Sequence, residues 1–239
     1  MKTVLFVAAA ASAVVASADA GFLGFVASSR TVGAYTVVDI FAGVQNASDK
    51  FLNVYNTTSN GVFFQATGLA NKTWKPDSAN FNSTRNSIDS FMTAGTYSGG
   101  SYGGEYYAST NTNGDPNFTG NSWNASPASA AATTIPALAG WYTGDPTSID
   151  NSAESIVGLQ NRINGSNAAG ANFGIWCAHL VLTGNQLIGT DFTFSAFASI
   201  KDGVSGAVSQ ASSSFAAIPA PGAIALLGLA GFAARRRRA

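Results

Sequence analysis

Cys177 and His179 come closest to forming a reactive pair in this sequence. They lie two residues apart in a strand-like run, so both side chains would project from one face of a strand. A thiol needs its activating base within about 3 Å, whereas such neighbours in a strand lie roughly 7 Å apart. A zinc site would need two more ligands. We therefore expect a buried free thiol and a packed or edge histidine, and no catalytic residue.

The carboxylates offer no clear acid–base pair. Glu105 and Glu154 are the only glutamates, and aspartates such as Asp115 and Asp145 each precede a proline in a turn-like context. Glycoside hydrolysis needs two carboxyl groups about 5–10 Å apart across a cleft. The sequence leaves this open, so a polysaccharide-processing enzyme is the third and weakest functional alternative.

One segment has side-chain oxygens at alternating positions, as a calcium loop does. Asn111, Asn113 and Asp115 lie in the stretch NTNGDPN. The terminal bidentate glutamate of an EF-hand loop is missing, and an Asn-Gly turn explains the same residues. We expect no cofactor and no metal, with Ca²⁺ as the alternative.

Four tyrosines stand among glycines in the stretch TYSGGSYGGEYYAS. They are Tyr97, Tyr102, Tyr106 and Tyr107. Exposed tyrosines give apolar area with a polar tip and can stack on sugar rings. The alternative is an ordinary glycine-rich loop with partly buried tyrosines. This stretch is the basis for a carbohydrate-binding hypothesis.

Composition indicates a folded chain with a neutral polar surface. Charged residues make up 10% of the 239 residues, well below the usual quarter. The 16 Phe, 7 Tyr and 4 Trp supply enough apolar area for a core. The one cysteine excludes an intrachain disulfide, so stability must come from packing.

Short apolar runs alternate with turn clusters through the body of the chain. The runs AYTVVDIFAGV, FLNVY and VFFQA are separated by Asn/Ser/Gly-rich turns, which predicts an antiparallel meander. In the first run, Tyr35, Val37, Asp39 and Phe41 share one face by the two-residue period. Both faces are largely apolar, as in a strand covered on both sides. SIDSFMTAG reads as a further strand.

A late hairpin and one helix complete the expected body. FGIWCAHLVLTG and LIGTDFTFSAFAS are two strand-like runs around the turn residues Gly184 and Asn185. The segment from Ser152 to Ile163 predicts a short helix with Ile156, Leu159 and Ile163 facing inward. The expected fold is an all-β antiparallel β-sandwich, jelly-roll or immunoglobulin-like, spanning residues 21–216.

The start of the chain has the three regions of a secretory signal peptide. Lys2 is followed by an apolar stretch up to Val15 and then by small residues ending at Ala20. An A-x-A pattern allows cleavage after Ala18 or Ala20. We expect residues 1–20 to direct export and to be removed.

The end of the chain has an apolar run backed by arginines. Thirteen residues from Gly222 to Ala234 carry no charge, fewer than the ~20 that a full bilayer crossing needs. The arginines would remain on the cytoplasmic side by the positive-inside rule and hold the body outside. The segment 217–239 therefore predicts a transient membrane anchor, through a short transmembrane helix.

The order of these features resembles the PEP-CTERM sorting signal of exported bacterial proteins. The box Pro219-Ala220-Pro221-Gly222 precedes the Ala/Leu/Gly-rich run, and Arg235, Arg236, Arg237 and Arg238 follow it. The central glutamate of the family box is replaced here by Ala220. The resemblance implies processing by an exosortase-like membrane enzyme and a place at the cell surface, often with exopolysaccharide. Phrases such as DKFLNVYN and GWYTGDP are also similar to the bodies of such proteins.

The charge of the processed chain excludes nucleic acid as a partner. Removing Lys2 and Arg235–Arg238 from 12 basic residues, and Asp19 from 12 acidic ones, leaves 7 against 11 and a net charge of −4. No basic stripe remains to displace counterions from phosphates. We expect a non-enzymatic structural protein of the cell surface or extracellular matrix. The alternatives are a carbohydrate-binding, lectin-like sandwich and the enzyme named above.

Overall fold

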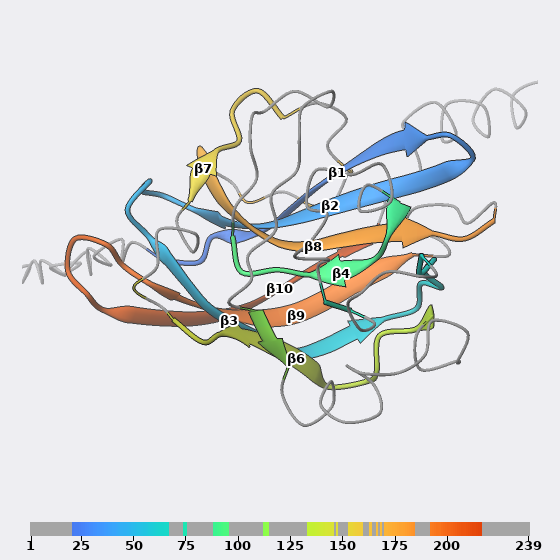
Figure 1. Ribbon diagram of the computed structural model, residues 1–239. Coiled ribbons are helices and arrows are strands. Elements are labelled where there is room, and N and C mark those ends of the chain that lie inside the picture. Colours follow the sequence, from blue (N-terminus) through green and yellow to red (C-terminus); the bar gives the residue numbers. More distant parts are fainter. Residues whose placement is uncertain are drawn as a thin grey trace, which may run out of the picture.

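The computed structural model describes the greater part of the body of the chain. These residues are 21–66, 74–75, 88–95, 112–114, 133–145, 147, 153–159, 163, 166, 168, 170–184 and 192–216. They form ten strands and no complete helix (Figure 1). Among them, no helix has the length and apolar character that crossing a membrane requires. The predicted signal segment 1–20 and sorting segment 217–239 lie outside the described residues.

The strands form two antiparallel sheets. Sheet A has the order β1-β2-β8-β4, and β7 also pairs with β8. Sheet B has the order β10-β9-β3-β6-β5. The strands of sheet A are β1 (Gly24–Val32), β2 (Tyr35–Val44), β4 (Phe91–Met92), β7 (Glu154–Ser155) and β8 (Phe173–Leu182). Those of sheet B are β3 (Lys50–Ser59), β5 (Thr112–Gly114), β6 (Ala139–Thr143), β9 (Thr193–Lys201) and β10 (Val208–Ala216).

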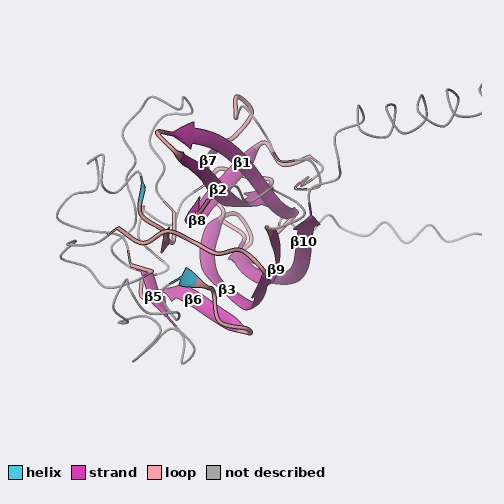
Figure 2. Ribbon diagram, turned by 90° about the vertical axis from the view of Figure 1, so that its right-hand side faces the viewer, coloured by secondary structure: helices cyan, strands magenta, loops and turns pink. Residues whose placement is uncertain are grey.

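The sheets face each other across one apolar core, with β1, β2 and β8 in one layer and β3, β6 and β9 in the other (Figure 2). Sheet A contributes Val38 and Ile40, and sheet B contributes Val54, Trp141 and further large side chains. The strand β8 is buried on both faces, as expected from its unbroken apolar sequence. The prediction of an all-β sandwich is confirmed at this level.

The expected connections between strands are wrong. The runs that begin at Tyr35 and Phe51 belong to β2 and β3, which lie in different sheets, and Phe63 of the third run forms a single bridge to β8. The late hairpin is wrong for the same reason, because β8 lies in sheet A and β9 in sheet B. Each of these connections carries the chain from one sheet to the other, so the two strands that it joins do not pair with each other.

The predicted helix is also wrong where the structure describes it. Glu154 and Ser155 form β7, which pairs with β8, and the backbone N–H of Ile156 continues this pairing to the carbonyl of Asn172. A turn follows at residues 157–158. The prediction that Ile156, Leu159 and Ile163 face inward is confirmed, since all three are buried. Apolar spacing alone does not distinguish a helix from a strand followed by turns.

Candidate functional site

Four residues form a row across sheet A, one on each of its main strands. In the strand register Ser28 lies opposite Asp39, Asp39 opposite His179, and His179 opposite Phe91. All four side chains are fully buried. Asp39 alternates with core residues of β2, so the row lies on the face of sheet A that points away from sheet B. Two consecutive strands, β1 and β2, and the distant strand β8 thus place a serine, a carboxylate and an imidazole side by side.

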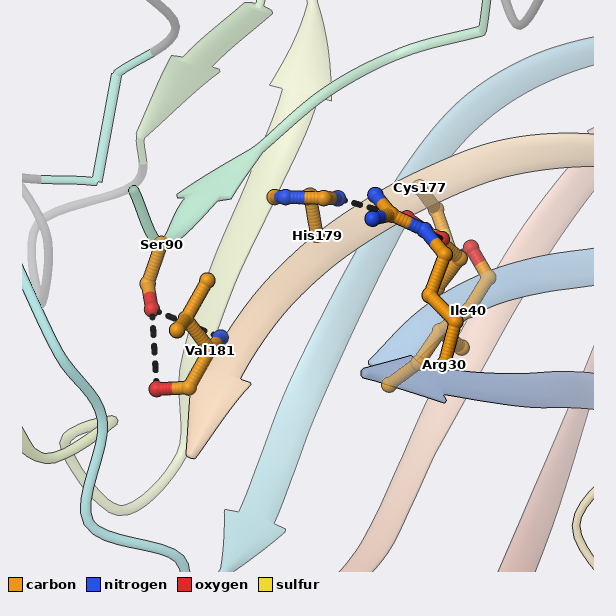
Figure 3. A network of polar contacts seen from close by, with 7 residues as sticks. Arg30, Ile40, Ser90, Cys177, His179 and Val181 are labelled. Carbon is orange, nitrogen blue, oxygen red and sulfur yellow. Dashed lines mark hydrogen bonds and ion pairs between the residues drawn. The ribbon is translucent and has the colours of Figure 1, made fainter. Parts of the chain in front are cut away.

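The carboxylate of Asp39 joins a histidine and an arginine. Its Oδ1 lies 2.6 Å from Nδ1 of His179, and its Oδ2 lies 3.5 Å from Nε of Arg30. An ionised carboxylate only accepts hydrogen bonds, so Nδ1 of the imidazole is the donor. This bond fixes the orientation and tautomer of the ring, as in catalytic histidine–aspartate pairs. Figure 3 shows Arg30 and His179 converging from β1 and β8.

Aromatic rings close off the histidine. Phe91 stacks on the imidazole with centroids 4.9 Å apart, and Trp176 meets it edge-on at 5.7 Å. Beside them, the hydroxyl of Ser90 accepts a hydrogen bond from the backbone N–H of Val181 at 2.9 Å (Figure 3). Because Asp39 and His179 have no exposed surface, a solute cannot reach them in this conformation. The arrangement suits a structural polar cluster better than a reaction centre.

Cys177 and His179 do not share a strand face, contrary to the expectation from alternation. In the pairing of β2 with β8, Ile40 lies opposite Ala178 but Phe41 lies opposite Trp176, which leaves Cys177 as the extra residue of a β-bulge. Cys177 therefore joins the core between the sheets, where its thiol donates to the carbonyl of Ile40 at 3.3 Å. Burial raises the pKa of this thiol far above its usual value. The predictions of a buried thiol and a packed histidine are confirmed.

The outer face of sheet B carries a second constellation, which is open to solvent. Tyr55 of β3 and Phe197 of β9 lie opposite each other and form an offset stack, with centroids 5.3 Å apart and planes inclined by 25°. Tyr142 of β6 lies opposite Asn53, diagonally across from Tyr55. Phe197 is 37% exposed and Tyr142 is 43% exposed. We call Tyr55, Tyr142 and Phe197 the aromatic platform.

Two irregularities in β3 produce this face. Phe51 pairs with Ile200 but Asn53 with Ser199, so Leu52 is an extra residue, and a second shift follows Tyr55, where Asn56 has a positive φ of 52°. Such bulges re-aim side chains within a sheet. They allow Phe51 to enter the core and still direct Tyr55 outward.

Most residues predicted from the sequence to form sites lie outside the described residues. This holds for the tyrosines of the glycine-rich stretch, the sorting-signal residues and one glutamate: Tyr97, Tyr102, Tyr106, Tyr107, Pro219, Ala220, Pro221, Gly222, Arg235, Arg236, Arg237, Arg238 and Glu105. Of the three residues suggested as calcium ligands, only Asn113 is described, in β5 opposite Tyr142. Within the described part of the chain, no three acidic, histidine or cysteine side chains gather as a metal site would require.

Sequence reasoning missed both constellations. The two-residue period predicts the correct face of β2 for Asp39, but its partners Arg30 and His179 come from other strands, and only the sheet pairing reveals them. Phe192 and Phe194 share one face of the strand by the two-residue period, whereas Phe197 falls on the opposite face. This difference is the one signal in the sequence that Phe197 is exposed.

No known protein-family model matches this chain, and neither a curated protein nor a solved structure matches it. Its function is therefore inferred from its own residues and their geometry.

Proposed function

We propose that this chain is an exported, non-enzymatic protein of the cell surface or exopolysaccharide matrix, whose tail is processed by an exosortase-like enzyme. The observation that carries the proposal is the order of features at the end of the sequence, with a proline box, a short apolar run and Arg235–Arg238. The apolar run is too short for a strongly held span, and the arginines orient it with the body outside.

The described body supports a structural role. It is a two-sheet sandwich, and we expect it to be of the jelly-roll or immunoglobulin-like type. The one thiol is buried in the core, and the histidine–aspartate pair is closed to solutes. The groups best suited to nucleophilic or proton-transfer chemistry in this part of the chain therefore contribute to packing.

The test is the intact mass of the protein recovered from each cell fraction. We expect the surface or matrix form to lack the residues up to Ala18 or Ala20 and those after about Pro219. The quadruple variant R235Q/R236Q/R237Q/R238Q should leave the tail uncleaved, because the apolar run loses its orienting charge.

The matched control is R235K/R236K/R237K/R238K, which keeps four positive charges and should still be processed. Full-length protein in the cytosol, with both ends present, would refute the proposal. Export with a permanently retained tail would refute the exosortase step alone.

A second function, carbohydrate binding, is favoured by the exposed aromatic side chains of sheet B. Rings with an apolar face and polar neighbours suit sugar rings. The glycine-rich stretch that contains Tyr102 is a second candidate for such binding, and the variant Tyr102→Ala separates the two candidates.

A further inference from the structure

We propose that the outer edge of β10 pairs with the same edge of a second copy of this chain and so forms a dimer. The outer edge of β10 is the side of Val208–Ala216 that faces away from β9. The pairing joins the two copies of sheet B into one continuous antiparallel sheet. The inference goes beyond the proposed function, because it concerns how two copies of the body meet and holds wherever the chain is located.

The backbone of β10 presents a row of open hydrogen-bonding groups. β10 is the last strand of sheet B and pairs with β9 over its whole length without a bulge (Figure 2). The N–H of Asp202 donates to the carbonyl of Ala207 at 2.8 Å, so odd-numbered residues direct their backbone groups toward β9. Four residues therefore direct their N–H and C=O groups away from β9: Val208, Gln210, Ser212 and Ser214. In the part of the chain that the structure describes, no residue forms a hydrogen bond with these groups.

The other sheet edges are shorter or carry neighbours. On β1, the carbonyl of Ala27 accepts from the N–H of Ile163 at 2.7 Å, and its N–H donates to the hydroxyl of Ser166 at 3.0 Å. β4 has two residues, and the N–H of Met92 donates to the carbonyl of Trp74 at 2.9 Å. β5 and β7 have three and two residues. β10 therefore offers the longest uninterrupted edge in the described body.

The sequence of β10 contains none of the residues that keep strand edges apart. Its nine residues, VSQASSSFA, include no charged residue and no proline. Natural sheets protect long edges with lysines, prolines or bulges, because unpaired N–H and C=O groups are a template for another chain. Since like charges opposite each other destabilise a strand pair, an uncharged strand is compatible with its own copy.

Contacts on the inner side of β10 hold the strand in place. The backbone N–H of Phe25 donates to the hydroxyl of Ser213 at 3.2 Å. The ring of Phe215 is buried and stacks on that of Phe194, with centroids 5.7 Å apart. A strand that is already ordered loses little conformational freedom when it pairs, so less of the interaction free energy is spent on ordering.

Pairing with a second copy satisfies both edges at once. Two identical antiparallel strands are related by a two-fold axis, so each copy offers the groups that the other needs and the assembly closes as a dimer. With the axis at Ser212, Gln210 lies opposite Ser214 of the second copy, where an amide and a hydroxyl can form a hydrogen bond. Ala211, Ser212 and Ser214 are small and exposed, so the two backbones can approach to the strand spacing of about 4.8 Å.

The test is sedimentation of the purified, exported protein over a range of concentrations, where we expect a reversible equilibrium between monomer and dimer. Ser212→Pro should weaken dimerisation about tenfold or more, because proline removes an outward N–H and leaves the pairing of β10 with β9 intact. The matched control is Ser212→Ala, which keeps this N–H and should dimerise as the wild type does. Thermal unfolding verifies that each variant is folded.

Two charged variants identify the partner as a second copy. In Ser212→Lys and in Ser212→Glu, like charges meet across the two-fold axis, so each variant alone should dimerise about tenfold more weakly than the wild type. An equimolar mixture of the two should form dimers again, because opposite charges then meet. Val157→Lys adds a charge at an exposed residue outside sheet B and should dimerise as the wild type does.

Hydrogen exchange locates the contact. The N–H groups of Val208, Gln210, Ser212 and Ser214 should exchange more slowly at high protein concentration than at low concentration. A wild type that is still monomeric at about 1 mM, or a mixture of the charged variants as monomeric as its components, would overturn the inference. Dimers that Ser212→Pro leaves unchanged and Tyr142→Ala abolishes would overturn it too, since the contact would then be the aromatic platform. Export and tail cleavage are measured separately, so a processed protein that stays monomeric refutes this inference alone.

Discussion

Replacing Asp39 by asparagine removes the charge that unites three strands of sheet A. Asp39 has no exposed surface, and its oxygens lie 2.6 Å from His179 and 3.5 Å from Arg30. The asparagine keeps the shape and one acceptor oxygen, but it leaves the guanidinium beside a neutral group. Breaking a buried ion pair by removing one partner costs about 3–5 kcal/mol. Because one acceptor survives, we expect a loss near 3 kcal/mol, a large share of the usual stability of a domain.

The measurement is urea unfolding at neutral pH, with the midpoint shifted and the slope unchanged. Asp145→Asn, at an exposed turn, is the matched control and should change stability by less than about 0.5 kcal/mol. In a double-mutant cycle of Asp39→Asn with His179→Gln, we expect a coupling free energy of about 1 kcal/mol or more between the two residues. A loss no greater than that of the control, or strict additivity, would refute the view that this cluster holds the sheet together.

Three further outcomes follow from the described contacts. Burial raises the pKa of the Cys177 thiol, so this residue should react with a thiol reagent only in denaturant. Labelling of the native protein at the rate of a free thiol would contradict its place in the core. Gly203→Ala should destabilise the folded protein by about 1–3 kcal/mol, because an added Cβ would meet the carbonyl oxygen of Ser48. Gly158→Ala is the control, since the space around it is open, and it should be neutral or slightly stabilising. Comparable denaturation midpoints for the two variants would contradict this. Backbone N–H groups three and two residues further on lower the pKa of Asp202, so its carboxylate adds stability at neutral pH that is lost as the pH falls through the lowered value. Asp202→Asn should therefore narrow the difference in stability between pH 7 and pH 3, measured by denaturation, and an unchanged difference would show that this carboxylate is not linked to folding.

Which face of a strand is buried could be predicted from the sequence. Val38, Ile40 and Ala42 enter the core, and Asp39 and Phe41 face the other way, as the two-residue period requires. The class of fold followed from the same runs and turn clusters. These features are local, and a single strand contains all the information that determines them.

Pairing and bulges could not be predicted in the same way. The turn after β8 resembles a hairpin turn, yet the chain changes sheet there, and only the packing of both sheets decides that outcome. An unbroken apolar run contains no signal of the bulge at Cys177. The two-residue period therefore predicts that Cys177 and His179 share a face, which is wrong for Cys177. The aromatic platform depends on two such irregularities in β3, and it was missed for the same reason.

The first and last described strands run side by side, and this has a mechanical consequence. The backbone N–H of Phe22 binds the hydroxyl of Ser209, and that of Phe25 binds the hydroxyl of Ser213, so β1 and β10 are parallel. A parallel pair places the beginning of one strand and the end of the other at opposite ends of the sandwich. Tension between the two ends of the described body would therefore load this contact in shear, with both hydrogen bonds resisting together instead of opening one at a time. The described body would then resist extension along the axis of these two strands.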